Sequence, residues 1–486
     1  MILTRSQMID AESSAFARGV RAEDLMEVAG GRMADMVRQS HPHPGTCRVL
    51  AGKGHNGGDA LVAARHLAAS GWRIEVETIF PNSELAPLTS LQLSRLPDSS
   101  RGESGPHVVL DGLLGIGATG AARCPVSEAI ERINFLRSHH GAWVLSADVP
   151  SGLDADTGSP LGPCVRADAT LTMGFAKAGL VDDRATEFVG RLAVASLPDV
   201  VAPTAADPAC LAGPAVLAPL VPPRPFEIHK GTCGRVAVVA GSTGLTGAAR
   251  LCSQAAVQGG AGLVTLYVPR EIYPILAASA APEVMVQPLD SLAEVAAHRF
   301  DVLAIGPGLG ADRREQILRL IDACPVPVVI DADALNAISD GHMDILKTPA
   351  GPRLLTPHPG EMERLCPQAG RTRRVWLEDF VSRYPVTLLL KGSRTIIGEA
   401  DQPPVFNTTG HPGMASGGMG DVLTGVCAAL IAQGQSAYHA AVIGAWTCGR
   451  AAEIAIAAGA SQESLRASDV SNALGRAFAA ARANGL

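Results

Sequence analysis

A glycine-dense turn at residues 410–421 contains residue types that could carry phosphate chemistry. Apolar residues at helical spacing follow the turn: Val422, Leu423, Val426, Leu430 and Ile431. Glycines at 417, 418 and 420 let backbone N–H groups turn inward, and the start of a helix adds partial positive charge, so this turn suits a phosphate. Asp421 would repel that ligand unless it takes a proton from a hydroxyl group beside the phosphoryl group; the alternative is that Asp421 caps the helix.

Polar side chains also follow the ends of three predicted strands in the first half of the chain. These side chains are Asn56, Asp59, Asp111, Asp148 and Ser151. The carboxyl ends of parallel strands meet at one edge of a sheet, the usual ligand side, so we expect these groups to lie together. Neutral and anionic oxygens suit a hard cation. The alternative is that the acids cap helices and orient loops.

The first of these turns also contains the pattern G-x-G-x-x-G, from Gly52 to Gly57, with Glu77 further on. This pattern is typical of a Rossmann dinucleotide site. However, Asn56 and Asp59 put side-chain oxygens into the turn, where a pyrophosphate cradle usually carries none, and a second glycine turn follows at 112–120. A cation site is therefore favoured over a plain dinucleotide site.

The elements that must position these residues alternate between strand and helix. Two predicted helices occupy residues 1–40, and then a strand at 47–51, a helix at 60–67 and a strand at 74–80 form a βαβ unit. The pattern begins again with a strand at 235–240, and a glycine- or proline-bearing loop follows nearly every later strand. The sequence predicts the α/β class, with two αβα domains on parallel sheets.

A proline-rich stretch separates the two halves, with prolines at 198, 203, 208, 214, 219, 222, 223 and 225. We predict a first domain at 1–205, a linker at 206–224 with a short helix around 213–220, and a second domain at 225–486.

The composition narrows the class of protein. Hydrophobic residues make up 47% and charged residues 18% of the 486 residues, which is typical of a globular protein with a large core. The net charge of −7 argues against nucleic acid as a partner, and we found no apolar run of membrane-spanning length and no signal peptide. The ten cysteines form no C-x-x-C pair. We therefore expect a cytoplasmic protein with reduced thiols that binds neither nucleic acid nor membranes.

Both halves resemble known enzyme domains. In the first half, the motifs at 54–59, 111–115 and 148–154 resemble the Rossmann-like epimerase domain of NAD(P)H-hydrate repair proteins. In the second half, the motifs at 229–231, 306–308, 356–361 and 417–421 look like the companion dehydratase domain, which has a ribokinase-like fold. Several matches in the same order along the chain are far more specific than any single glycine motif.

The resemblance implies repair of NADHX and NADPHX, the hydrated forms of NADH and NADPH. The first domain would interconvert the R and S epimers, and the second would dehydrate the S form at the expense of ADP, giving AMP and phosphate. A potassium ion is implied for the epimerase domain and a magnesium ion with ADP for the dehydratase domain. We also expect a homo-oligomer.

The resemblance also implies roles for individual residues. Asp148 and Asp421 would be catalytic, and the potassium ligands would be Asn56, Asp111 and Ser151. The epimerase substrate would contact His55, Asn56, Gly57, Gly58, Asp59, Gly115, Ile116, Gly117, Ala118, Thr119, Gly120, Ala121 and Asp148. The dehydratase substrate would contact Ala261, Gly308, His358 and Asp421. The nucleotide phosphates would contact Lys391, Gly392, Ser393, Arg394, Thr395 and Gly420.

The chain departs from the family pattern in the first turn. His55 stands where the family has the first of two asparagines, and Ala60 replaces a glycine. No lysine occurs between Lys53 and Lys177, so a lysine partner for Asp148 cannot come from that stretch. Two other functions compete with repair: a ribokinase-type small-molecule kinase with a regulatory dinucleotide-binding N-terminal half, and a non-catalytic dinucleotide sensor.

Overall fold

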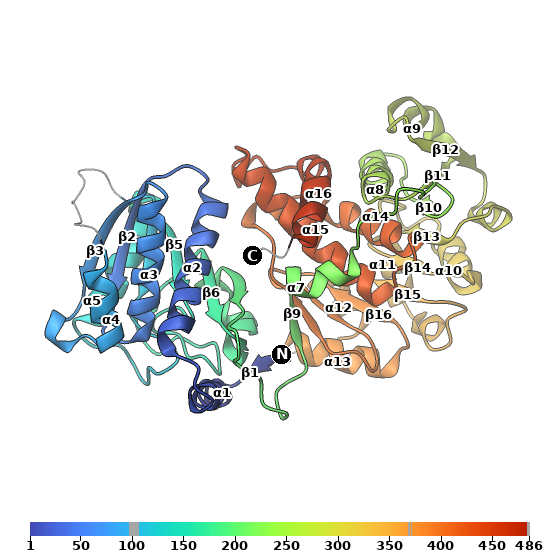
Figure 1. Cartoon of the computed structure of the whole chain (residues 1–486). Helices are drawn as coiled ribbons and strands as arrows, with labels where there is room; N and C mark the ends of the chain where they lie inside the picture. Colours follow the sequence, from blue (N-terminus) through green and yellow to red (C-terminus); the bar gives the residue numbers. More distant parts are fainter. Residues whose placement is uncertain (97–105, 368–369, 371, 484–486) are drawn as a thin grey trace. The chain divides into compact units, whose positions relative to one another are not determined.

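The computed structural model of the protein describes residues 1–96, 106–367, 370 and 372–483. The chain divides into two compact units, Met1–Ala209 and the part from Cys210 onward, and each unit is built on its own sheet (Figure 1). Both sheets are mainly parallel with helical connections, so the predicted α/β class is confirmed.

The first unit has a six-stranded parallel sheet in the order β3-β2-β4-β5-β6-β8, and β1 pairs separately with β7. The strands are β1 Ile2–Leu3, β2 Thr46–Ala51, β3 Arg73–Thr78, β4 Val108–Gly112, β5 Trp143–Ala147, β6 Ala169–Met173, β7 Ala176–Lys177 and β8 Arg191–Ala195. The helices are α1 Arg5–Ala17, α2 Ala22–Ser40, α3 His55–Ala69, α4 Pro87–Ser94, α5 Val126–His140 and α6 Thr186–Val189.

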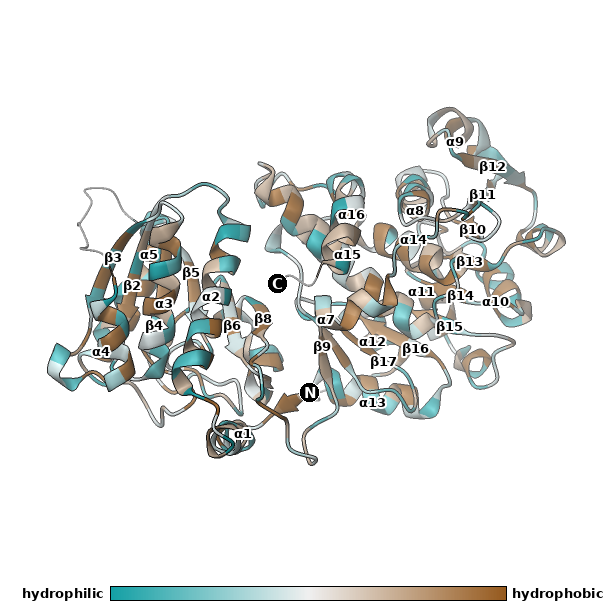
Figure 2. Ribbon diagram, in the orientation of Figure 1, coloured by the Kyte–Doolittle hydropathy of each residue, from teal (hydrophilic) through white to brown (hydrophobic). Residues whose placement is uncertain are grey.

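Helices cover both faces of this sheet, which makes three layers. On one face, Met33 of α2 and Leu61 of α3 belong to the same buried cluster as Val49 of the sheet. On the other face, Ile130 of α5 packs with Val109. The strands are therefore largely apolar along both faces, as the brown strands in Figure 2 show, and the ion pair of Arg48 in β2 with Glu75 in β3 is an exception within the strands.

The second unit has a ten-stranded sheet in the order β12-β11-β10-β13-β14-β15-β16-β17-β18-β9. The strands are β9 Cys210–Ala212, β10 Arg235–Val239, β11 Leu263–Pro269, β12 Val284–Leu289, β13 Val302–Ile305, β14 Val328–Ile330, β15 Arg353–Leu355, β16 Thr387–Leu390, β17 Ile396–Gly398 and β18 Val405–Asn407. Strands β12 to β16 are parallel, and β17 is antiparallel to both of its neighbours.

Helices again follow the strands of the second unit. They are α7 Pro214–Leu217, α8 Thr246–Gln258, α9 Tyr273–Ser279, α10 Arg314–Ala323, α11 Asp333–Ser339, α12 Pro359–Leu365, α13 Arg373–Arg383, α14 Met419–Ala432, α15 Ala437–Ala457 and α16 Ala467–Arg482. Helices α8, α14, α15 and α16 share one large buried cluster with the strands.

Helix α15 is an exception to the prediction that no apolar run reaches membrane-spanning length. By length and composition it could cross a membrane, and it is the one such helix in the described part of the chain. However, 67% of its apolar window is buried inside the unit, where it packs against α14 and α16. Its apolar character is accounted for by packing in a core of small side chains.

The proline-rich segment differs from the predicted linker. Within residues 206–224 lie strand β9, which extends the second sheet beside β18, and helix α7, followed by a short 3-10 turn at Ala218–Leu220. The predicted short helix at 213–220 is present as these two turns. Prolines 214 and 219 stand in the first turns of these helical segments, where their missing N–H group costs nothing.

The two predicted glycine turns are themselves helix starts. Helix α3 begins at His55 after Gly54 in extended conformation, so Asp59 follows its first turn. Helix α14 begins at Met419, after Gly418 with a φ of 90°. The left-handed backbone at Gly418 favours glycine, and the first N–H groups of each helix have no carbonyl partner inside the helix.

Candidate functional site

In the first unit, Asp111 lies at the carboxyl end of β4 and is completely buried. Its carboxylate accepts hydrogen bonds from the Ser146 hydroxyl (2.8 Å), the Ser151 backbone N–H (2.9 Å) and the Ser151 hydroxyl (2.6 Å). Burial raises the pKa of Asp111, and the hydrogen bonds from Ser151 and Ser146 offset only part of that effect.

Asn56 and Ser151 meet Asp111 through the backbone of Leu114. The Asn56 side chain donates to the carbonyl oxygens of Leu114 (2.8 Å) and Ala147 (2.8 Å). The Ser151 hydroxyl oxygen accepts from the Leu114 N–H (2.9 Å) while it donates to Asp111. The structure thus brings the three predicted cation ligands to one place, as the parallel strand order requires.

The oxygen atoms of Asn56, Asp111 and Ser151 fit a hard cation of low charge. The Asn56 amide uses its NH₂ group for both bonds, which leaves its oxygen unused, and Asp111 receives only neutral donors in its recorded hydrogen bonds. A buried carboxylate without a positive partner is costly, so a bound cation would stabilise it. Among the described residues, no group of three or more His, Cys, Asp or Glu side chains is placed to hold a metal.

Asp148 follows β5 with a left-handed backbone, φ 65°. Its Oδ1 accepts from the Lys177 ammonium (2.5 Å), the Met173 N–H (2.9 Å) and the Thr172 hydroxyl (3.1 Å). The Lys177 ammonium is buried and also donates to the Met173 carbonyl (2.8 Å) and Thr172 (3.0 Å). The lysine partner of Asp148 therefore exists and comes from β7, a role that was not predicted for Lys177.

A second carboxyl group near Asp148 has a different environment. Burial raises the pKa of Asp59 well above its ordinary value, and the charges of Asp148 and Glu12 raise it further. Asp59 follows the first turn of α3 and is itself buried. The site therefore combines a lysine-paired carboxylate with a carboxyl group that keeps its proton to higher pH.

The predicted substrate loop at 115–121 lies beside these residues and is mostly exposed from Gly117 to Ala121. Gly115 leaves room at its start, because a Cβ atom there would lie only 3.1 Å from the Asn56 side-chain oxygen and would push that side chain aside. Gly57 is required for a similar reason, because its Cβ would lie 2.3 Å from the Gly52 carbonyl. The loop and the α3 start can therefore approach each other closely.

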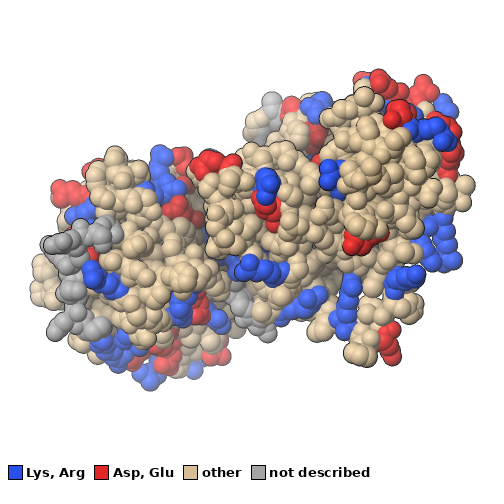
Figure 3. Space-filling model, turned by 90° about the horizontal axis from the view of Figure 1, so that it is seen from above, with Lys and Arg blue, Asp and Glu red and all other residues tan. Residues whose placement is uncertain are grey.

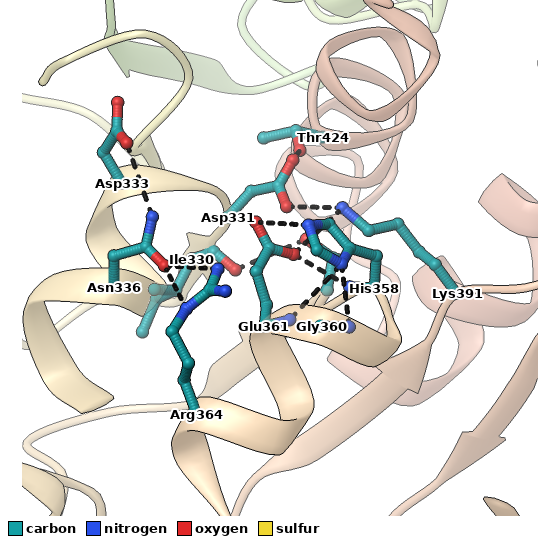
Figure 4. A network of polar contacts seen from close by, with 11 residues as sticks. Ile330, Asp331, Asp333, Asn336, His358, Gly360, Glu361, Arg364, Lys391 and Thr424 are labelled. Atoms are coloured by element: carbon teal, nitrogen blue, oxygen red, sulfur yellow. Dashed lines mark hydrogen bonds and ion pairs between the residues drawn. The ribbon is translucent and has the colours of Figure 1, made fainter. Parts of the chain in front are cut away.

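In the second unit, Asp331 is the centre of a polar network at the end of β14 (Figure 4). Its carboxylate accepts from the Lys391 ammonium (2.8 Å) and from the Thr424 hydroxyl (2.8 Å). Burial would raise the pKa of Asp331, but Lys391 and the Thr424 and Thr356 hydroxyls outweigh it, so the pKa lies below its ordinary value. Asp331 was noted in the sequence only as a strand end.

Helix α14 brings Gly420 and Asp421 to this network. A Cβ atom at Gly420 would lie 3.3 Å from the Lys391 ammonium and 3.4 Å from an Asp331 oxygen, so the first turn of α14 faces both. The pKa of Asp421 is raised to about 6, because burial and the Asp331 charge outweigh the opposing effect of Lys391. Asp421 can therefore accept a proton near neutral pH, as a general base requires.

His358 caps helix α12. Its ring Nδ1 accepts from the backbone N–H groups of Gly360 (3.0 Å) and Glu361 (3.3 Å). The Glu361 carboxylate in turn accepts from the backbone N–H of His358 (2.8 Å). The Lys391 ammonium lies 3.8 Å from the same Glu361 carboxylate. His358, predicted as a substrate contact, thus has a structural function that holds its half-exposed ring beside the network.

The predicted phosphate loop at 391–395 joins β16 to β17, which are antiparallel. Gly392 and Ser393 are exposed, whereas Arg394 is 3% exposed, so the Arg394 side chain is directed into the protein. Arg373 of α13 donates to the carbonyl oxygens of Lys391 (3.4 Å) and Arg394 (2.9 Å). Arg373 was not predicted, because its position has no motif of its own.

Of the predicted contacts with the dehydratase substrate, Gly308 lies at the same edge of the sheet as Asp331 and Asp421, and Ala261 does not. Gly308 follows β13, and its carbonyl accepts from the Ser242 hydroxyl (2.8 Å) at the end of β10. Ala261 precedes β11, which runs parallel to β10 and β12. It therefore lies at the edge where strands begin, and within one copy of the unit it cannot meet His358 or Asp421.

Comparisons with known proteins agree with this arrangement. A family model described as YjeF-related protein N-terminus matches residues 22–179, and one described as NAD(P)H-hydrate dehydratase matches residues 236–475. The bifunctional NAD(P)H-hydrate repair enzyme of Moorella thermoacetica is 37% identical over 88% of this chain and 87% of its own length. The chain belongs to the family of bifunctional NAD(P)H-hydrate repair enzymes. The family member from Escherichia coli is 34% identical over 94% of this chain and 90% of its own length.

Solved structures support the fold of the second half of this chain, which the dehydratase family model matches. The ADP/ATP-dependent NAD(P)H-hydrate dehydratase of Bacillus subtilis, co-crystallised with ATP and Mg²⁺, matches with a TM-score of 0.50 and 27% identity, over 55% of this chain and 97% of that one. A ribokinase-like superfamily protein from Enterococcus faecalis also has a TM-score of 0.50, at 25% identity over 58% of this chain and 99% of that one. The predicted ribokinase-like fold is confirmed.

Proposed function

We propose that the first unit interconverts R and S NAD(P)HX and that the second dehydrates S-NAD(P)HX with ADP, giving NAD(P)H, AMP and phosphate. The observation that supports this proposal is the placement of Asp421 in the first turn of α14, which faces the Lys391 ammonium, with the pKa of Asp421 raised to about 6. We infer that a base and an anion site for one phosphoryl transfer lie together there.

In the dehydratase, the hydroxyl group of the hydrate would attack the terminal phosphorus of ADP, and AMP would leave. Asp421 would take the hydroxyl proton, while Lys391 and the N–H groups of α14 stabilise charge on the phosphoryl group. The lone pair of the ring nitrogen would then expel phosphate, and loss of a proton from the neighbouring carbon would restore the double bond.

In the epimerase, the ring nitrogen would assist cleavage of the carbon–oxygen bond, and the oxygen would return on the opposite face of the ring. Asp148 would carry the proton to and from this oxygen, with Lys177 holding its carboxylate in place. Asp59 is a further proton donor in reach of the same charges, since its pKa is affected by Asp148.

Two ions fit the residues present. Asn56, Asp111 and Ser151 would hold a potassium ion, which would supply the positive charge that buried Asp111 lacks. A magnesium ion would be held mainly by nucleotide phosphates, with Glu361 and Asp331 as the carboxylates of this chain beside Lys391. Lys391 to Thr395 and Gly420 would bind those phosphates, and Gly308 and His358 would contact the hydrate.

We further propose that ADP is the preferred co-substrate, that the protein is a cytoplasmic homo-oligomer, and that it binds neither nucleic acid nor membranes. The ten free cysteines support a reducing compartment. On the face seen in Figure 3, acidic and basic side chains are interspersed, and the net charge is −7, so neither observation favours a nucleic-acid partner.

The test is recovery of reduced-nicotinamide absorbance from a mixture of R and S hydrates, with ADP, magnesium and potassium supplied. Complete recovery is the expected result and requires both activities. Recovery that stops when the S form is exhausted would refute the epimerase assignment. No recovery, together with accumulation of a phosphate ester of another substrate from ATP, would identify a kinase instead.

A further inference from the structure

The N-terminal segment, residues 2–17, lies outside the stretch that the family model matches, which begins at residue 22. It consists of β1 and α1. Strand β1 pairs in parallel with β7, and the register places Leu3 opposite Lys177. The backbone that carries the lysine partner of Asp148 is therefore held by this segment.

Helix α1 packs against the loop that holds the same lysine. Its buried face consists of Met8, Ala11 and Ala15. A Cβ atom at Gly174 would lie 2.8 Å from the Met8 methyl group, so Met8 lies directly on that residue. Gly174 follows Met173, whose backbone hydrogen-bonds to both Asp148 and Lys177.

The segment also contacts the predicted substrate loop. The Arg5 guanidinium donates to the Gly117 carbonyl (3.2 Å), and Ile116 packs against the apolar cluster that contains Met8. In addition, the Arg5 backbone N–H donates to the Asp156 carboxylate (2.6 Å). The loop at 115–121 is otherwise mostly exposed, so these contacts hold it at one side.

We propose that residues 2–17 are a working part of the epimerase site, in which Arg5 positions the substrate loop while β1 and Met8 hold the backbone that carries Lys177. Arg5 does not need to touch the reacting carbon; it is a positioning residue. This role presupposes the epimerase activity proposed above, so wild-type protein that fails to epimerise would refute that activity and would leave these contacts without a function.

Arg5→Ala tests the loop contact, with Arg18→Ala as the matched control. Arg18 lies just after the same helix, and its guanidinium also donates to one carbonyl, that of Asp199, away from the substrate loop. We expect Arg5→Ala to lower the epimerase kcat/KM about tenfold, mainly through KM, because one hydrogen bond from a charged donor is lost. Arg5→Lys should restore part of the loss, and Arg18→Ala should behave as wild type.

Dehydratase activity of the same chain and the thermal unfolding of the first unit separate this effect from misfolding. Both should be unchanged in Arg5→Ala. Equal epimerase kinetics for Arg5→Ala and Arg18→Ala would overturn the role of Arg5. A fall in kcat alone, without a change in KM, would also contradict loop positioning.

Discussion

The two units each hold a lysine–aspartate pair at the carboxyl edge of a parallel sheet, but they bury opposite partners. In the first unit, the Lys177 side chain is 1% exposed and that of Asp148 is 10% exposed. In the second, the Lys391 side chain is 20% exposed and that of Asp331 only 2%. In each pair, the partner with the more exposed side chain is the one that we propose a substrate reaches.

This difference matches the two kinds of chemistry. A carboxylate held by a buried lysine is placed to move a proton on and off an oxygen, whereas a lysine held by a buried carboxylate is placed to meet a phosphate. Under the proposed function, the same ion pair, inverted, would distinguish an epimerase site from a phosphoryl-transfer site.

The largest expected effect sharpens the phosphoryl side of this comparison. Asp421→Asn should reduce dehydratase kcat by about 10²–10⁴-fold, the contribution of a general base, while epimerase activity stays at the wild-type level. Asp322→Asn, an exposed change on α10, is the control. Dehydratase activity within a fewfold of wild type in Asp421→Asn would refute the role of Asp421 as the base, and the N-cap of α14 is Gly418 rather than Asp421.

Removing each aspartate tests the inversion directly. Asp148→Asn leaves the Lys177 ammonium buried without its carboxylate, so we expect it to abolish epimerisation and destabilise the first unit by about 3–5 kcal/mol. Asp331→Asn leaves a lysine that can reach solvent, so the second unit should lose less stability. Thermal unfolding of both variants measures the difference, and equal losses would break the comparison.

The pH dependence of the dehydratase offers a finer test. Its kcat/KM should rise with pH through about 6 as Asp421 loses its proton. The Asp331 charge is one cause of the raised Asp421 pKa, so in Asp331→Asn the rise should move to lower pH. A rise that stays in place, or moves to higher pH, would show that Asp331 does not act on Asp421.

The smallest expected effect concerns the cation. Replacing potassium by a bulky organic cation should slow epimerisation and lower the unfolding temperature of the first unit alone. Asp111→Asn should abolish this sensitivity, because the carboxylate that a cation would balance is gone. A similar cation dependence in both units would point to a general salt effect.

Much of each site could be predicted because its residues follow strands directly in the sequence. Asp111, Asp148 and the glycine turn before Asp421 were all recognisable in this way. The sequence predicts helices that start at residue 60 and after residue 421, whereas the structure starts them at His55 and Met419. The predicted starts are too late because glycines normally argue against a helix interior, so the glycine-rich residues were assigned to turns.

The contacts within the sites were less predictable. The sequence shows only that no lysine lies between Lys53 and Lys177, and it assigns Lys177 no role. In the structure Lys177, 29 positions after Asp148, donates a hydrogen bond to it directly. Ala261 was grouped with Asp421 although its strand places it at the opposite edge of the sheet. Motif matching carries no information about which edge a loop occupies.

By itself, the sequence determined the order of strands, turns and helices, because apolar periodicity and glycine placement act over a few neighbouring residues. Only the tertiary structure decided which charges pair. Asp331 meets Lys391 across 60 positions and Thr424 across 93. The first contact exists because strands β14, β15 and β16 lie side by side in the sheet, and the second because α14 packs against β14. Burial then makes each charge depend on the partner that the fold supplies.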